Sequence, residues 1–198
     1  MLRAIILDLN GVFINAEPLS RRIEKEFNVP AKNFYICLEE ALKPARLPNS
    51  LPFFQIIEPC LKKLGLALSE KEFLDFWFVG ERLAPEMMAL AKKWRQKDLK
   101  VLILSRNFKE RTEYYRENFP ELFVHIDKTY FSWETGLAKP DPEAYMSILR
   151  EWRLKPEETA FFDDKDENVK AAQNLGIIAR LFESPEITDE FVSRFSQN

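Results

Sequence analysis

Short and almost wholly apolar runs recur along this chain of 198 residues, and segments with helical spacing separate them. Continuous apolar runs of this length, rich in β-branched and aromatic residues, are typical of strands that are covered on both faces. They occupy residues 4–9, 101–105, 129–131, 160–163 and 177–181. Because strands that alternate with helices form parallel sheets with right-handed crossovers, the pattern predicts an α/β fold.

The segments between the later runs carry helix signals. Residues 108–118 have mixed polar and aromatic spacing, and residues 142–152 begin with a proline directly after Asp141, a candidate N-cap. Residues 166–175 are amphipathic and stop before Gly176, a residue that commonly ends helices. Each of these segments is therefore predicted to be a helix that packs on the sheet.

Residues 15–85 break the alternation, because they contain no convincing buried strand. Helical patterns cover residues 17–27, 53–64 and 69–78, and Ser69 with Glu72 forms a candidate capping box, while Pro59 is expected to bend or interrupt the second helix. Aromatic residues of this segment are expected to form its own packing core: Phe53, Phe54, Phe73, Phe76, Trp77 and Phe78. The prediction is a core of residues 1–14 and 86–198 with a helical cap of residues 15–85.

Composition restricts the partners. Hydrophobic residues make up 46% of the chain, which is enough for an ordinary core, and the net charge is −3 with dispersed lysines and arginines. Neither nucleic acid nor a membrane is therefore expected as a partner. Cys37 and Cys60 lack metal-type spacing, so we expect a reduced, cytoplasmic protein. The oligomeric state is left open.

Chemically useful side chains follow the predicted strands. Asp8 closes the first, Ser105 the second, and Asp163 and Asp164 the fourth, while Lys139 lies in a loop. Each alone has an ordinary structural explanation, as a cap, a turn residue or a solvated lysine. Together they would meet at one edge of the sheet, where three carboxylates repel one another unless a cation compensates. A Mg²⁺ ion beside a hydroxyl and an ammonium group makes phosphoryl chemistry the leading hypothesis.

Four segments in this order carry a resemblance: "DLNGV", "LILSRN", "GLAKPDPEAY" and "FFDDKDENVKAAQNLG". They resemble the four successive motifs of the haloacid dehalogenase-like hydrolase superfamily across nearly the whole chain. The resemblance is greatest to sugar-phosphate phosphatases and to the N-terminal phosphatase domain of soluble epoxide hydrolases. It implies a Rossmann-like α/β core with helices on both faces of the sheet, a helical cap inserted after the first strand, and a small phosphate ester as substrate.

The resemblance also implies residue roles. Asp8 would be the nucleophile that forms an aspartyl-phosphate, and Lys139 would pair with it and with the phosphate. The substrate phosphoryl group would be held by Ser105, Arg106, Asn107 and Lys139. The metal ligands would be Asp8, the main-chain carbonyl of Asn10, and Asp164 with Asp163.

Asn10 departs from the family pattern, because most phosphatases of the family have a second aspartate there that transfers protons. An amide cannot exchange a proton in this way, and such assistance is typically worth ~10²–10⁴-fold in rate. Three hypotheses follow: a phosphatase weakened or specialised for good leaving groups, a non-catalytic phosphate binder, or a 2-haloacid dehalogenase. The retained Asp163–Asp164 pair argues against the last, because those relatives use no metal. Deamidation at Asn10-Gly11 is a fourth, smaller hypothesis.

Three further residues are not assigned a functional role from the sequence. Arg46 and Arg82 lie in the helical segment and are expected to be solvated. Asn168 either braces the Asp163–Asp164 loop or is only an early helix residue.

Overall fold

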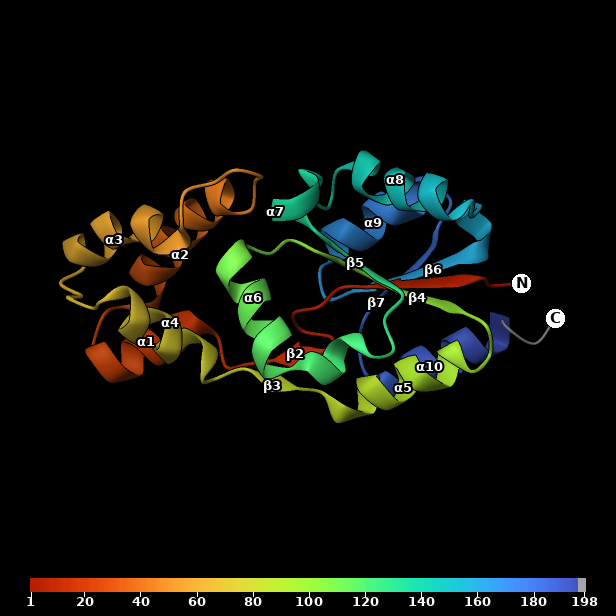
Figure 1. Cartoon of the computed structure of the whole chain (residues 1–198), viewed down its shortest axis with the longest axis horizontal. Coiled ribbons are helices and arrows are strands. Elements are labelled where there is room, and N and C mark those ends of the chain that lie inside the picture. Colours follow the sequence, from red (N-terminus) through yellow and green to blue (C-terminus); the bar gives the residue numbers. More distant parts are fainter. Residues whose placement is uncertain (196–198) are drawn as a thin grey trace.

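The computed structural model describes residues 1–195 and contains a five-stranded parallel sheet (Figure 1). The strand order is β5-β4-β1-β6-β7. The strands are β1 (Ala4–Leu7), β4 (Lys100–Ser105), β5 (Lys128–Phe131), β6 (Thr159–Asp163) and β7 (Ile178–Leu181). Every apolar run that predicted a strand lies in this sheet, and the parallel register confirms the α/β class.

Helices cover both faces of the sheet because both faces are apolar. Along β1, Ile5 and Leu7 belong to one buried cluster, whereas Ala4 and Ile6 belong to another. This division follows from the strand's two-residue period. Figure 1 shows α8 (Pro142–Trp152) and α9 (Asp166–Asn174) over one face, and α5 (Pro85–Arg95) and α10 (Pro185–Phe195) over the other.

The remaining helices of the core connect strands. They are α6 (Lys109–Asn118), α7 (Ser132–Thr135) and the 3₁₀ helices η1 (Pro120–Phe123) and η2 (Pro156–Glu158). The predicted helices at 108–118, 142–152 and 166–175 are confirmed as α6, α8 and α9, and the Asp141 side chain caps α8 by accepting from the Glu143 N–H at 2.9 Å. Helices α5 and α10 were not predicted.

The segment of residues 16–81 is helical and lies beyond the carboxyl end of the sheet (Figure 1). Two short antiparallel strands, β2 (Ile14–Asn15) and β3 (Arg82–Leu83), pair where the chain enters and leaves it. Between them lie α1 (Leu19–Phe27), α2 (Ala31–Ala45), α3 (Phe53–Lys63) and α4 (Glu70–Phe78). The capping box of Ser69 and Glu72 is confirmed at the start of α4, and α3 continues through Pro59.

Helix α2 was missed, although its sequence carries the signal. Its buried residues Phe34, Cys37, Leu38, Ala41, Leu42 and Ala45 recur at the spacing of one helical face. The helix contains Pro44 in its last turn, where the ring still fits. A proline within a helical pattern normally indicates a break, so Pro44 obscures this signal in the sequence.

Helices α1–α4 bury a hydrophobic cluster of their own. The predicted aromatic core is present in it, with Phe76 only partly buried. Phe108, at the start of α6, joins this cluster and stacks on Phe53 with ring centroids 4.4 Å apart. On this basis we propose the division into a cap of residues 15–85 and a core of residues 1–14 and 86–198, of which 196–198 lie outside the described residues.

The two cysteines of the chain lie on neighbouring helices. The expectation of reduced cysteines is wrong in this structure, because Cys37 of α2 and Cys60 of α3 form a disulfide with Cα atoms 6.0 Å apart. The packing of α2 on α3 brings the two residues together, and sequence spacing does not reveal such packing. Among the described residues, no helix is long and apolar enough to cross a membrane.

Candidate active site

The three central strands deliver acidic and polar residues to one place. Strand β1 lies between β4 and β6, so Asp8, Ser105 and Asp163 come from adjacent strand ends. The Asp8 N–H continues the ladder by donating to Phe162 O at 2.9 Å. Carboxylate oxygens of Asp8, Asp163 and Asp164 lie within 4.8 Å of one another. The predicted convergence of the three carboxylates is therefore present.

Asp8 is nearly buried, with 7% of its surface exposed. Its Oδ1 accepts from the Leu9 N–H at 2.7 Å and lies 2.9 Å from Lys139 Nζ. Within residues 1–195, no hydrogen-bond or salt-bridge partner holds Oδ2. One oxygen of this carboxylate is thus fixed by the protein, and the other is left for chemistry.

Lys139 bridges two acidic residues in a buried position. Its ammonium group lies 2.9 Å from Asp8 Oδ1 and 2.5 Å from Asp163 Oδ2, and only 2% of the residue is exposed. A buried ammonium group is costly unless it is paired and hydrogen-bonded, and here two carboxylates meet that need. The loop that carries it continues through a cis Lys139–Pro140 bond. The alternative of a solvated loop lysine is excluded for Lys139.

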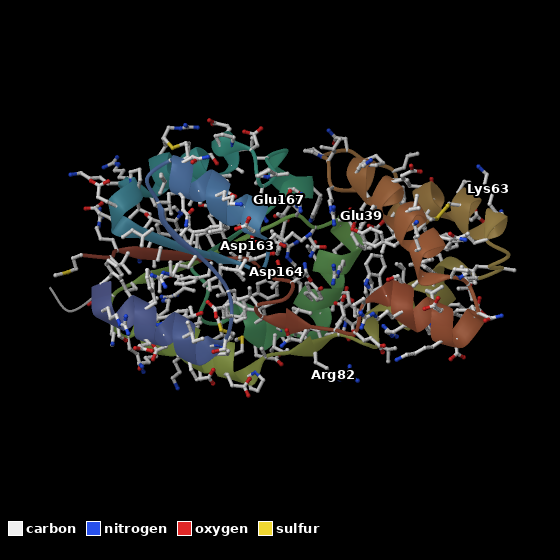
Figure 2. The ribbon with its side chains drawn as sticks, turned by 180° about the vertical axis from the view of Figure 1, so that it is seen from behind. Glu39, Lys63, Arg82, Asp163, Asp164 and Glu167 are labelled. Atoms are coloured by element: carbon white, nitrogen blue, oxygen red, sulfur yellow. A yellow bond between two sulfur atoms is a disulfide. The ribbon has the colours of Figure 1, made fainter. Side chains whose placement is uncertain are left out.

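Asp163 and Asp164 are neighbours in sequence but differ in their surroundings. Asp163 is fully buried, and its Oδ1 accepts from Asn168 Nδ2 at 2.8 Å and from the Lys165 N–H at 2.9 Å. Asn168 therefore braces the loop. Asp164 lines the pocket, and burial, followed by the charges of Asp8 and Asp163, raises the pKa of its carboxyl group. Figure 2 shows the pair where the sheet faces the cap.

Gly11 brings the backbone close to Asp164. Its φ of +85° is in the region that favours glycine, and a Cβ added there would lie 2.9 Å from Asp164 Oδ2. The turn after β1 therefore has no room for a side chain at this position. The Gly11 N–H donates to Ile14 O at 2.8 Å. Because that nitrogen would have to attack the Asn10 side chain during deamidation, the turn disfavours that reaction.

Two buried donors at and just after the end of β4 lack partners in the described chain. Ser105 Oγ and Asn107 Nδ2 are shielded from solvent without a hydrogen bond. Ser105 lines the pocket, whereas Asn107 is not among the lining residues, and its Oδ1 accepts from the Phe108 N–H at 3.1 Å. Unpaired buried polar groups are uncommon in proteins, so each indicates a missing acceptor or a functional role.

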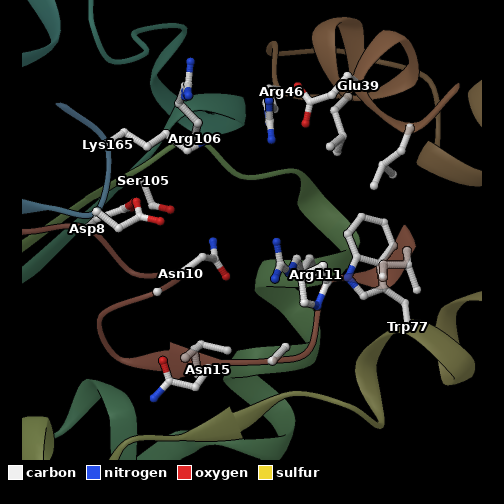
Figure 3. Close-up of a pocket in the computed structure, with 18 of the residues that line it drawn as sticks. Asp8, Asn10, Asn15, Glu39, Arg46, Trp77, Ser105, Arg106, Arg111 and Lys165 are labelled. Atoms are coloured by element: carbon white, nitrogen blue, oxygen red, sulfur yellow. The ribbon is translucent and has the colours of Figure 1, made fainter. Parts of the chain in front are cut away.

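The side chain of Asn10 is held in a defined orientation. Tyr115, which is fully buried, donates its hydroxyl hydrogen to Asn10 Oδ1 at 2.9 Å. Burial raises the pKa of Tyr115 well above its ordinary value, so the phenol stays protonated and remains a donor. With the carbonyl oxygen engaged, the amide Nδ2 of Asn10 is the group left to donate (Figure 3).

A pocket of about 390 Å³ opens between these strand ends and the cap. Figure 3 shows Arg46, Glu39, Arg111 and Trp77 around it, together with Asp8 and Ser105. The predicted residues Asn10, Arg106 and Lys139 also line it, whereas Asp163 and Asn107 do not. Arg82 is exposed, as expected, and lies away from the Asp163–Asp164 pair (Figure 2).

The expectation that Arg46 is solvated is wrong. Arg46, the residue that follows the end of α2, is only partly exposed and lines the pocket. Sequence reasoning also missed Arg111 and Trp77, whose contact is cation–π, with the guanidinium carbon 5.3 Å from the ring centroid. For Arg46 the sequence did carry a signal. Leu38, Leu42 and Arg46 are spaced four residues apart, so a helix over this segment would place all three on one side, and all three line the pocket.

Comparison with known proteins agrees with this geometry. A family model described as haloacid dehalogenase-like hydrolase matches residues 2–176, and the chain belongs to this family. Bifunctional epoxide hydrolase 2 of Sus scrofa is 26% identical over 91% of this chain, but the match covers only 36% of that protein. The chain thus spans little more than a third of this longer relative. The phosphorylated carbohydrates phosphatase of Thermotoga maritima is 24% identical, with 89% of this chain and 82% of that protein covered.

Solved structures share the fold. A HAD family enzyme of Bacteroides thetaiotaomicron, in a magnesium complex, has a TM-score of 0.75 and 25% identity, with 92% of this chain and 93% of that one covered. The L-2-haloacid dehalogenase of Xanthobacter autotrophicus has a TM-score of 0.66 at 18% identity, with 98% and 83% covered. The chain is a member of this hydrolase family, and its acidic cluster is of a kind that can hold a metal ion.

Proposed function

We propose that the protein is a Mg²⁺-dependent phosphatase that acts on a small phosphate ester through an aspartyl-phosphate. The observation that carries the proposal is the cluster of Asp8, Asp163 and Asp164, whose carboxylate oxygens lie within 4.8 Å of one another. Relatives named as phosphatases support the same reaction class. The residues named below have these roles as part of the proposal.

The donor set fits a hard divalent cation. All candidate ligands are oxygen atoms, and the raised pKa of Asp164 reflects burial and the repulsion of its acidic neighbours, which a cation would relieve. Asp8, Asp164 and the Asn10 main-chain carbonyl would hold Mg²⁺. When bound, Mg²⁺ would supply positive charge against the phosphoryl oxygens. Both oxygens of Asp163 already accept from protein donors, so we assign it to positioning Lys139 and the loop.

The chemical step needs an anion to attack an anion. An Asp8 oxygen forms the new bond to phosphorus as the ester oxygen departs, and water later cleaves the aspartyl-phosphate. Lys139 lowers the repulsion from its position 2.9 Å from Asp8. Ser105 Oγ is a buried donor without a partner that lines the pocket, and it offers a hydrogen bond to a phosphoryl oxygen. Asn107 Nδ2 is also buried without a partner but does not line the pocket.

Asn10 determines which esters react fastest. Its Nδ2 can hydrogen-bond the departing oxygen but cannot protonate it, so esters whose alcohols leave as stable anions are favoured. Aryl, acyl and anomeric sugar phosphates belong to this class. Tyr115 is assigned to positioning, because its hydroxyl fixes the amide that would make this hydrogen bond.

Hydrolysis of p-nitrophenyl phosphate with Mg²⁺, and its loss with a chelator, tests the proposal. Asn10→Asp is expected to raise the rate on alkyl phosphates more than on aryl phosphates, because a carboxyl group restores proton transfer. Asn15→Asp is the matched control, since it adds the same charge at an exposed position on the pocket margin.

Three other results would contradict the proposal in different ways. Phosphate binding without turnover by either the native protein or Asn10→Asp would favour a non-catalytic phosphate binder. Metal-independent halide release from a 2-halo acid would identify a dehalogenase. An equal rate increase for both ester classes would refute the role given to Asn10.

A further inference from the structure

Arg46 differs from the other arginines that line the pocket. Arg106 has a carboxylate partner in Glu167 at 3.3 Å, and Arg111 has one in Glu81 at 2.5 Å. Within residues 1–195 the Arg46 side chain has neither a hydrogen bond nor a salt bridge, and its Nε is shielded from solvent without a partner. Among the described residues, the charge of the Arg46 guanidinium is therefore not balanced by a salt bridge.

The surroundings of Arg46 favour the binding of an anion next to its guanidinium. Burial lowers the pKa of its guanidinium, and the charges of Arg106 and Arg111 add to that effect. Glu39, on the same helix, and Asp8 oppose it, but neither forms a salt bridge with Arg46. A partly desolvated guanidinium is costly unless its planar set of donors is satisfied. An arriving anion would recover that cost.

The position of Arg46 separates it from the end of the pocket assigned to the phosphoryl group. Asp8, Ser105 and Lys139 come from the core, whereas Arg46 ends cap helix α2 and points into the pocket from the opposite side (Figure 3). Apolar side chains of Leu42 and Trp77 line the pocket as well. A ligand that reaches both ends thus meets one set of donors at each end.

We propose that Arg46 binds a second anionic group of the substrate. The substrate class is then a phosphate monoester that also carries a carboxylate or a second phosphate group. Either group matches the paired N–H donors of a guanidinium. This inference rests on the proposed function, because it takes the Asp8 end of the pocket as the site of the reacting phosphoryl group.

Equilibrium binding in the presence of Mg²⁺ tests the inference without relying on turnover. The protein would carry Asp8→Asn so that no ligand is consumed, and calorimetry would measure matched pairs. 3-Phosphoglycerate is compared with glycerol 3-phosphate, in which a hydroxymethyl group replaces the carboxylate. Propane-1,3-diyl bisphosphate is compared with 3-hydroxypropyl phosphate, which lacks the second phosphate.

The ligand with two anionic groups is expected to bind roughly tenfold to a hundredfold more tightly in at least one pair, the range for charge-assisted hydrogen bonds. The pair that shows the preference identifies carboxylate or phosphate as the second group. Arg46→Met should abolish the preference, and Arg46→Lys should retain part of it. Arg82→Met, which removes an exposed arginine outside the pocket, should leave it unchanged. Circular dichroism would establish that each variant folds, and Arg46→Lys serves if Arg46→Met does not.

Two outcomes would overturn the inference. One is equal affinity within both pairs for the unsubstituted Arg46 protein. The other is an equal loss for both members of a pair in Arg46→Met, which would assign Arg46 to the reacting phosphoryl group. If p-nitrophenyl phosphate is hydrolysed in a Mg²⁺-dependent manner, either outcome removes the inference and leaves the proposed function intact. If the native protein hydrolyses no phosphate ester but the binding preference still depends on Arg46, the proposed phosphatase function fails and the anion-binding role of Arg46 stands.

Discussion

Replacing Gly11 with alanine tests how the turn after β1 supports the metal site. At φ +85°, an added Cβ would lie 2.9 Å from Asp164 Oδ2 and 3.1 Å from its Cγ, whereas ordinary contact begins at 3.4 Å. Relieving the contact therefore needs a shift of about half an ångström in Asp164 or in the turn. Gly65 provides a matched control, because its φ is +76° and an added Cβ there meets nothing within 4 Å.

Both variants share the strain of a left-handed alanine, ~1–2 kcal/mol, of which ~0.4–1 kcal/mol is offset by the stiffer unfolded chain. A net loss near 1 kcal/mol lowers the Tm of a chain of this size by about 2–4 °C. Only Gly11→Ala also displaces Asp164. Because Mg²⁺ needs near-ideal octahedral geometry and altered support of metal ligands typically costs ~10–100-fold in affinity, we expect a loss of that size.

The assay measures Mg²⁺ dependence in both variants. Titration of Mg²⁺ against p-nitrophenyl phosphate hydrolysis, and against the Tm in the absence of substrate, gives an apparent affinity by two routes. Gly65→Ala should retain the native Mg²⁺ affinity despite its lower Tm. The reasoning is refuted if Gly11→Ala and Gly65→Ala require the same Mg²⁺ concentration.

Three other predictions follow from charged and hydrogen-bonding groups of the site. Lys139→Met should lower the free energy of unfolding by ~3–5 kcal/mol in chemical denaturation, because it leaves two buried carboxylates without their cation, and a loss below about 1 kcal/mol would contradict this. Tyr115→Phe should cost ~0.5–1.5 kcal/mol in the same measurement, and it should slow alkyl phosphate hydrolysis more than aryl hydrolysis; equal slowing would argue against the positioning role of Tyr115. The raised pKa of Asp164 means that the folded state binds its proton more tightly than the unfolded state, so without metal the Tm should fall as pH rises through that pKa. Asp164→Asn should remove this component, and excess Mg²⁺ should reverse it; a Tm profile identical to that of the native protein would contradict the assignment.

In the cap, local sequence patterns were insufficient to predict every helix and the contacts between helices. Its helices at 17–27, 53–64 and 69–78 were predicted from spacing and caps, but α2 was not, because it contains Pro44, a residue type that normally breaks helices. The disulfide of Cys37 with Cys60 depends on how α2 packs against α3, a contact between residues that are 23 positions apart. The pocket role of Arg46 depends on the same packing.

The sequence by itself determined the strands of the sheet, six of the helices, the carboxylates at the strand ends, and the amide at position 10. These follow from the short-range periodicity of apolar residues and from the rule that parallel strands end at one edge of their sheet. Only the tertiary structure decided that Asp163 holds Lys139 while Asp164 faces the pocket, that Tyr115 fixes Asn10, and that Arg46 reaches the site unpaired. The reason is physical, because these properties depend on distances between residues that are far apart in the chain and on the burial that their packing produces. Patterns among neighbouring residues do not determine such distances.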